Sequence, residues 1–281
     1  MTNLLVAIAT LLGLAIGSFL GVVVTRTVSG QSDLVRERSH CPGCRAKIRW
    51  FDNVPLLSWV LLGGRCRTCR GPISTLYPTL EMVTAAYFGG VTYWAFSDWA
   101  WFSEEQAAAG VLVLVAMLWF GSAGIALAAI DVKTMELPDA IVTSIYLVCL
   151  SSLVAASLIS GDSDSLIRGA VGCLSFLAVY GVLVFFFPRA MGMGDFKLSG
   201  SLGFILAWFG WGEAILGALF PFALASIFGL VLIWLGKAGR KTAIPFGPWM
   251  IVGTVLGLWF GGALWNSYLE FLRVQLSSAV G

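Results

Sequence analysis

Eight long apolar runs constrain the fold of this 281-residue chain more than any other feature of its sequence. A helix needs roughly 20 mostly apolar residues to cross a bilayer. With 58% hydrophobic and 11% charged residues, the chain also has more apolar surface than a water-soluble core could bury. We therefore expect an all-α polytopic membrane protein with about eight transmembrane helices. The spans are expected at about residues 3–24, 78–97, 108–130, 139–160, 165–187, 196–210, 213–236 and 246–270, the sixth being short.

The cations concentrate between the first two spans, where nine of the 17 Lys and Arg residues occur. Short cytoplasmic loops are enriched in Lys and Arg, so this segment is expected on the cytoplasmic side. Alternation of the spans then puts both chain ends outside and places Asp131 and Asp195, which border apolar runs, at the cytoplasmic face. Only Arg168 and Arg273 lie against this scheme.

A polar segment of about residues 25–78 is inserted between the first two spans. It is too long for an ordinary connection between helices, so we expect a small folded module. The chain then divides into a first transmembrane helix over residues 1–24, this module, and a seven-helix membrane region over residues 79–281.

The inserted segment contains two C-x-x-C elements with 21 residues between them. Each element presents two thiolates, and four thiolates complete a tetrahedral zinc site of the zinc-ribbon type. A module of this size buries little apolar area, so metal binding would supply much of its folding free energy. The expected zinc ligands are Cys41, Cys44, Cys66 and Cys69.

Two disulfides, or four unrelated thiols, are the alternatives for these cysteines. Disulfides persist in oxidising compartments, whereas the cations place the segment in the reducing cytosol, so its position favours zinc. His40 adjoins the first element and is a further candidate ligand, although four cysteines already complete the site. Cys149 and Cys173 lie inside expected spans, where a buried cysteine behaves as a small hydrophobe, and they receive no role.

Glycines recur at every fourth residue of the first span, at Gly13, Gly17 and Gly21. This spacing gives the helix one face without side chains. Such a face is typical of close packing between transmembrane helices, and we expect that role here.

Three acids follow the third apolar run, between Ile130 and Asp139. Pro138 suits the first turn of a helix, so Glu136 and Asp139 lie where a negative charge favours the helix dipole, and this capping role explains them. Asp131 lacks that explanation because it ends a helix, where a negative charge is disfavoured. A solvated loop acid and a functional carboxylate both remain open for Asp131 at this point.

The segment Gly192-Met193-Gly194-Asp195 puts a second carboxylate at a membrane border. Such a charge is costly there and is usually kept for function. Asp195 could instead cap the sixth span, and Lys197 could neutralise it. The two glycines favour function, because they let the chain turn sharply or let another backbone approach the acid.

If Asp131 and Asp195 converge, their repulsion raises one pKa, so that near neutrality one carboxyl holds a proton while the other is ionised. The ionised group would take a proton from water as the water attacks a peptide carbonyl, and the protonated group would polarise the carbonyl oxygen. This is the arrangement of an aspartic protease. An H-E-x-x-H zinc site is excluded because the chain has one histidine.

These motifs together resemble the type IV prepilin peptidases, bifunctional leader peptidases and N-methyltransferases of bacterial inner membranes. The resemblance covers nearly the whole chain. Its pieces are Gly17-Ser18-Phe19-Leu20, Cys41-Pro42-Gly43-Cys44, the stretch from Asp52 to Trp59, Cys66-Arg67-Thr68-Cys69, the stretch from Ile130 to Asp139, the stretch from Gly192 to Lys197, and the stretch from Ile244 to Pro248.

The resemblance implies that Asp131 and Asp195 are the catalytic aspartates. It implies cleavage of the basic leader of type IV prepilins or pseudopilins at the cytoplasmic face of the inner membrane. It also implies methylation of the new N-terminal residue with S-adenosylmethionine, an activity that the family couples to the cysteine loop. The methyl-donor contacts are not assigned. The expected partners are type IV prepilin or pseudopilin substrates and the lipid bilayer, and no nucleic acid is expected.

One residue departs from the family pattern, since Gly21 stands where the family usually has asparagine. This departure bears on methylation and leaves open a leader peptidase without methyltransferase activity. The basic leader needs an acidic docking surface, for which Glu136 and Asp139 are the nearest candidates beside their capping role.

Two functions of other classes are also open. In a transporter, Asp131 and Asp195 would relay protons or bind a cation, but acids near the bilayer midplane and an inverted repeat would then be expected. In a membrane scaffold, the zinc loop would recruit a partner, but both aspartates would be unnecessary.

Overall fold

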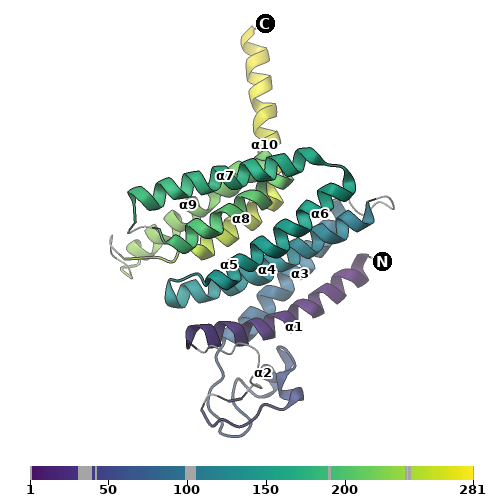
Figure 1. Cartoon of the computed structure of the whole chain (residues 1–281). Coiled ribbons are helices and arrows are strands. Elements are labelled where there is room, and N and C mark those ends of the chain that lie inside the picture. Colours follow the sequence, from purple (N-terminus) through teal and green to yellow (C-terminus); the bar gives the residue numbers. More distant parts are fainter. Residues whose placement is uncertain are drawn as a thin grey trace. The chain divides into compact units, whose positions relative to one another are not determined.

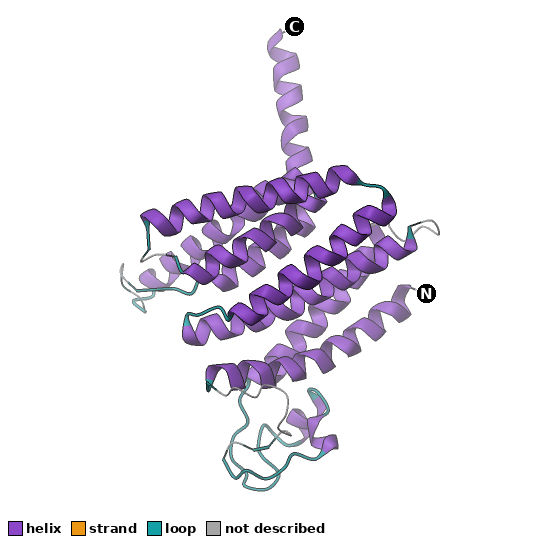
Figure 2. Ribbon diagram, in the orientation of Figure 1, coloured by secondary structure: helices purple, strands orange, loops and turns teal. Residues whose placement is uncertain are grey.

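The computed structural model describes residues 2–30, 40–41, 43–98, 106–188, 191–237, 239 and 242–280. The described residues are helical throughout, apart from loops and two isolated β-bridges, and Figure 2 shows the same predominance of helix. The chain forms two compact units, residues 1–134 and residues 135–281. Each unit is described by itself.

The first unit contains α1 (Thr2–Val28), α2 (Leu57–Leu61), α3 (Leu76–Asp98) and α4 (Ala107–Thr134), with the 3₁₀ turn η1 (Trp50–Asn53). The second contains α5 (Asp139–Ile145), the π-turn η3 (Tyr146–Leu150), α6 (Ser151–Ser160), α7 (Ser163–Phe186), α8 (Met193–Phe209), α9 (Trp211–Trp234) and α10 (Gly247–Val280).

Every expected span corresponds to a helix, with α5, η3 and α6 forming one continuous span. Six of these helices are long and apolar enough to cross a membrane. The other two are α8, which has only 17 residues, and α3, whose polar residues include Glu81. The prediction of an all-α polytopic membrane protein is confirmed, and the count of eight spans is approximate.

In the first unit, α1 packs along α3 and also contacts α4 (Figure 1). The glycine face of α1 makes this packing possible. A Cβ atom added at Gly13 would lie 2.7 Å from the Cα of Ala85, and one added at Gly17 would lie 2.6 Å from the Cα of Glu81. The two backbones are therefore as close as bare glycines allow, as the spacing of the glycines predicts.

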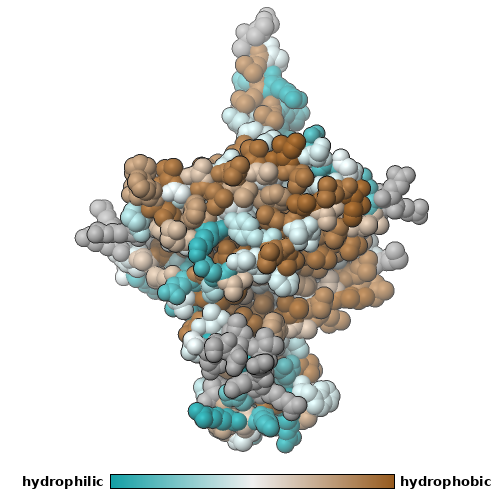
Figure 3. Space-filling view, viewed as in Figure 1, coloured by the Kyte–Doolittle hydropathy of each residue, from teal (hydrophilic) through white to brown (hydrophobic). Residues whose placement is uncertain are grey.

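In the second unit, α7 packs along α8 and α9 along α10. Residues Leu198–Trp208 of α8 are buried, because α7, α9, α10 and η3 surround this helix. The other long helices expose many large apolar side chains, and brown surface covers much of the visible face of the helices in Figure 3. The short α8 is thus enclosed by protein, while its neighbours present apolar surface on the outside of the unit.

Arg168, which lies against the expected distribution of cations, has a local structural role. Its guanidinium donates to the carbonyls of Ala207 at 3.4 Å and Trp208 at 3.2 Å, and to the hydroxyl of Ser165 at 2.7 Å. The first two carbonyls belong to the last turn of α8, where a cation is favoured by the helix dipole and satisfies unpaired acceptors. Arg168 therefore caps α8.

We expect Gly17→Ala to weaken the contact between α1 and α3, since the added Cβ would meet the backbone of α3 at 2.6 Å. Overpacking of this kind lowers the free energy of unfolding by roughly 1–3 kcal/mol. Thermal unfolding of the purified protein in detergent measures the effect. The control is Ala15→Leu, which adds volume on the exposed side of the same helix, and equal midpoints for the two variants would contradict the packing described.

Candidate functional site

The four cysteines of the inserted segment form one cluster. The sulfurs of Cys41, Cys44, Cys66 and Cys69 all lie within 4.8 Å of one another, and those of Cys41 and Cys69 are 3.8 Å apart. A tetrahedral zinc ion with bonds of about 2.3 Å to sulfur separates its ligands by about 3.8 Å, whereas a disulfide needs about 2.05 Å. The structure therefore supports the prediction of a four-cysteine metal site, and it excludes the two disulfides.

The two C-x-x-C turns repeat one backbone pattern. The amide of Cys41 donates to Ala46 and the amide of Cys66 to Gly71, in each case five residues further on. The isolated bridges His40–Lys47 and Arg65–Pro72 close the two turns at equivalent positions. Pro42 of the first turn lies outside the described residues. Each turn therefore presents its pair of sulfurs in the same way.

The backbone also favours the thiolate form at one ligand. Hydrogen bonds from the backbone of Cys69 and Thr68 lower the pKa of Cys66 to about 6. A metal binds the thiolate and not the thiol, so this shift favours ligation at Cys66, whereas the pKa of Cys44 in the other turn is raised to about 11. His40 takes part in a bridge rather than in the four-sulfur group, which is the one group of three or more candidate ligands among the described residues.

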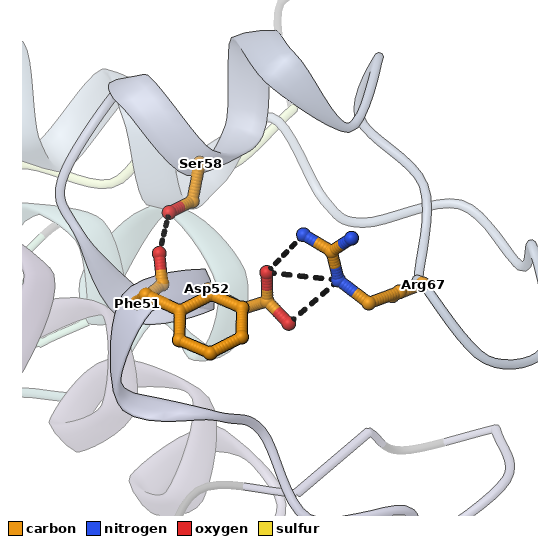
Figure 4. Close-up of polar contacts among 4 residues, drawn as sticks. All are labelled: Phe51, Asp52, Ser58 and Arg67. Carbon is orange, nitrogen blue, oxygen red and sulfur yellow. Dashed lines mark hydrogen bonds and ion pairs between the residues drawn. The ribbon is translucent and has the colours of Figure 1, made fainter.

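The stretch from Asp52 to Trp59 is attached to the second cysteine turn by an ion pair. Arg67, which lies between Cys66 and Cys69, donates to both carboxylate oxygens of Asp52, at 2.6 to 3.1 Å (Figure 4). The hydrogen bond from Arg67 lowers the pKa of Asp52. The hydroxyl of Ser58 donates to the carbonyl of Phe51 at 2.7 Å and so joins α2 to η1. These contacts make the segment a folded module.

Glu81 connects this module to the helices of its unit. It is 5% exposed on α3, and its Oε2 accepts a hydrogen bond of 2.7 Å from the amide of Leu56, the residue before α2. Glu81 was not among the residues predicted from the sequence. A single acid inside the apolar run of residues 78–97 is the signal that could have indicated it, because a charge in such a run is usually functional.

Asp131 lies in the last turn of α4 and is 5% exposed. Its position at the C-terminal end of a helix agrees with the sequence. Its burial excludes the alternative of a solvated loop acid. Asp131 belongs to the first unit of the structure.

Asp195 lies in the first turn of α8, is 8% exposed, and belongs to the second unit. Its Oδ2 accepts a hydrogen bond of 3.1 Å from the amide of Gly192. This contact is half of a capping box, so Asp195 helps to cap α8 from its N3 position, while the N-cap residue itself is Gly192 and not Asp195. The carboxylate is more deeply buried than a capping residue at the protein surface needs to be.

The start of α8 is held against the segment that leads into α5. A Cβ added at Gly194 would lie 2.9 Å from the Cβ of Leu137, so the glycine allows this close approach. The ammonium of Lys197 lies 2.7 and 2.8 Å from the carboxylate oxygens of Asp139. The cation that could have neutralised Asp195 is therefore paired with Asp139. Glu136 is exposed.

The π-turn η3 brings a further side chain to the start of α8. The hydroxyl of Tyr146 donates to the carbonyl of Lys197 at 2.7 Å and lies close to Gly200. A π-turn within a helix is frequently found at functional sites. This turn could not be predicted from the sequence, because its hydrophobic pattern resembles that of the flanking helix.

The stretch from Ile244 to Pro248 contributes an aromatic ring to the second unit. The ring of Phe246 lies 5.2 Å from that of Phe222 on α9 and 6.5 Å from that of Tyr180 on α7, measured between centroids. Tyr180 is 2% exposed. This stretch therefore packs the start of α10 against α7 and α9.

A side chain of α3 fills the space beside Gly21, the residue that departs from the family pattern. A Cβ added at Gly21 would lie 2.6 Å from the ring of Tyr77, whose hydroxyl accepts a hydrogen bond of 3.2 Å from Thr25. The tyrosine ring occupies the space that a larger residue at position 21 would need.

Fold and site define a multi-pass helical membrane protein with a four-cysteine module and two buried aspartates. Residues 11–96 match the family model for the bacterial peptidase A24 N-terminal domain, and residues 112–235 match that of the type IV leader peptidase family. The chain belongs to the type IV leader peptidase family.

Three relatives illustrate how much of the chain this similarity covers. The chain is 32% identical to the prepilin leader peptidase/N-methyltransferase of Stutzerimonas stutzeri over 290 residues, which cover 95% of this chain and 94% of the relative. It is 32% identical to the protein of the same name from Pseudomonas aeruginosa, over 93% of this chain and 92% of the relative. The Myxococcus xanthus relative of that name is 37% identical over 82% of this chain and 64% of its own length. No solved structure matches the chain.

We expect the purified protein to contain about one zinc ion per chain, because four thiolates form one tetrahedral site. Cys44→Ser should deplete the zinc, since three sulfurs hold the ion less tightly. Elemental analysis of the protein, together with its concentration, gives the ratio. Cys173→Ser removes a cysteine outside the cluster and should leave the zinc content unchanged. Zinc-free wild-type protein purified without chelators would contradict the assignment.

Proposed function

We propose that this protein removes the basic leader of type IV prepilins or pseudopilins and then methylates the new N-terminal residue. The relatives are named for both activities, prepilin leader peptidase and N-methyltransferase, which supports this function. Two buried carboxylates supply the chemistry of leader cleavage, and the four-cysteine module of the first unit is associated with methylation. The observation that carries the proposal is the burial of Asp131 and Asp195, at 5% and 8% exposure, in a chain of this family.

Asp131 and Asp195 are the proposed catalytic dyad. Each carboxylate is buried within its own unit, Asp131 in the last turn of α4 and Asp195 in the first turn of α8. A buried carboxylate beside an apolar run is costly and is usually kept for function, which supports a catalytic role for both.

A shared proton sets the roles of the two aspartates. Repulsion between close carboxylates keeps one protonated when the other is ionised. The ionised carboxylate accepts a proton from the water that attacks the scissile carbonyl, and the protonated one donates a hydrogen bond to the carbonyl oxygen. The proton then passes to the leaving amine as the carbon–nitrogen bond breaks.

We expect Asp131→Asn and Asp195→Asn each to lower the rate of leader cleavage by at least about 10²-fold, the lower range for loss of a general acid or base. The protein is incubated in detergent with a prepilin, and leader loss is followed on a gel. Asp164→Asn, an exposed acid in the first turn of α7, is the control and should cleave at the wild-type rate. Full cleavage by both aspartate variants would contradict the dyad.

The four-cysteine module is proposed to bind structural zinc and to serve methylation. S-adenosylmethionine is the proposed methyl donor, and no residue is assigned to it. Two separate family models cover residues 11–96 and 112–235, which supports a division of labour along the chain. The cation distribution supports a location in the bacterial inner membrane with module and dyad on the cytoplasmic side.

We expect Cys44→Ser to reduce methylation of the product much more than cleavage of the leader, because the zinc site lies in the module while the dyad lies on the long helices. Mass spectrometry of the mature substrate detects the methyl group, and the gel assay reports cleavage on the same samples. A wild-type product that is cleaved but never methylated would leave a leader peptidase alone. Parallel loss of both activities in Cys44→Ser would refute the division.

Glu136 is a better candidate than Asp139 for binding the cations of the leader. Asp139 is paired with Lys197, which reduces its negative charge. Glu136 is exposed and lies in the same segment. We therefore propose Glu136 as the acid that meets the leader.

A further inference from the structure

The short helix α2 turns its apolar side outward. Leu57, Val60 and Leu61 have the spacing that puts them on one helix face, and they are 56%, 66% and 75% exposed. On the rest of the helix, Ser58 is buried and the ring of Trp59 packs against Gly64. A module in water would place polar residues on the exposed face, so this face indicates contact with an apolar medium.

A tryptophan next to α2 has the same character. Trp50 begins η1 and is 83% exposed. The hydrogen bond from Ser58 to Phe51 joins η1 to α2. Tryptophan is enriched where membrane meets water, because its ring is apolar and its N–H is polar. The outer apolar surface of the module is defined here as Leu57, Val60 and Leu61, and Trp50 is a further exposed ring on the neighbouring η1.

Cations dominate the charge of the module that bears this surface. Residues 40–75 contain six Lys and Arg residues and one acid, Asp52, and that acid is paired with Arg67. A zinc tetrathiolate would add about two negative charges and leave the module positive. This charge attracts an anionic surface and repels the basic leader of a prepilin, so it favours lipid over substrate as the occupant of the outer apolar surface.

The depth of α2 is fixed by its attachment to α3. Glu81 is the sixth residue of α3 and accepts the amide of Leu56, the residue immediately before α2. The start of α2 therefore lies beside the second turn of α3, near the end of a helix that packs along α1, one of the helices apolar enough to cross a membrane. Interfacial helices lie at this level, with apolar side chains in the headgroup boundary.

We propose that the outer apolar surface rests in the leaflet at which α1 ends and α3 begins, with the module's cations on anionic headgroups. The lipid surface holds the module beside its own membrane helices. Glu81 positions α2 for this contact, since it binds the amide next to the apolar face.

Hydrogen exchange of the full-length protein tests this proposal. Amides within and just after α2 donate to Leu56, Ser58 and Val60, and they exchange only when the helix opens. We expect them to exchange at least about fivefold more slowly in nanodiscs of phosphatidylglycerol and phosphatidylcholine than in phosphatidylcholine alone, as interfacial cations strengthen binding. High salt should reduce the difference by screening the charges.

A pair of variants isolates the apolar contact. Leu61→Gln changes a side chain that is 75% exposed, so the module should keep its zinc, yet the protection in anionic nanodiscs should fall by at least about fivefold. Thr75→Gln, at an exposed polar position of the same module outside the cysteine turns, should keep both zinc and protection. Equal exchange in the two nanodiscs would overturn the proposal, as would protection that appears only when a prepilin is added in detergent.

Discussion

The contact between α1 and α3 is the interaction on which the first unit depends. Gly17 lies against the backbone of Glu81, and Glu81 holds the amide of Leu56 at the start of α2. A side chain on α1 at this point would push α3 away and move the carboxylate that anchors the module. In a bilayer, close van der Waals packing replaces the hydrophobic force between helices. One bare glycine therefore links helix packing to the position of the metal-binding segment.

The positions of the helices were predictable because a bilayer requires long apolar runs, and the runs can be read directly from the residues. The enclosure of α8 was not predictable in this way. Its residues from Leu198 to Trp208 are apolar or small, and composition does not tell whether such a helix faces lipid or other helices. Arg168 shows the same limit, since its capping of α8 depends on α7 lying alongside α8, a contact between separate parts of the chain.

The metal site was predictable from spacing, because the two ligands of each C-x-x-C turn are close in sequence and only the pairing of turns needs the fold. Asp131 and Asp195 were singled out because burying a carboxylate beside an apolar run is costly. This cost depends on the local sequence, and both carboxylates are indeed buried in the structure. Glu81 and Tyr146 act through single hydrogen bonds to backbone atoms of Leu56 and Lys197. Backbone atoms are common to all residues, so the sequence carries no pattern that marks such partners.

The repeated C-x-x-C turns have a consequence for the chain between α1 and α3. Each turn supplies two of the four sulfurs, so an ion bound by all four cross-links the two turns. The inner cysteines of these turns have 21 residues between them. A cross-link of this kind removes conformations chiefly from the unfolded chain. The ion therefore restricts this segment through the entropy of its unfolded state, and its loss would release the loop between the turns, with α2, even if the long helices stayed in place.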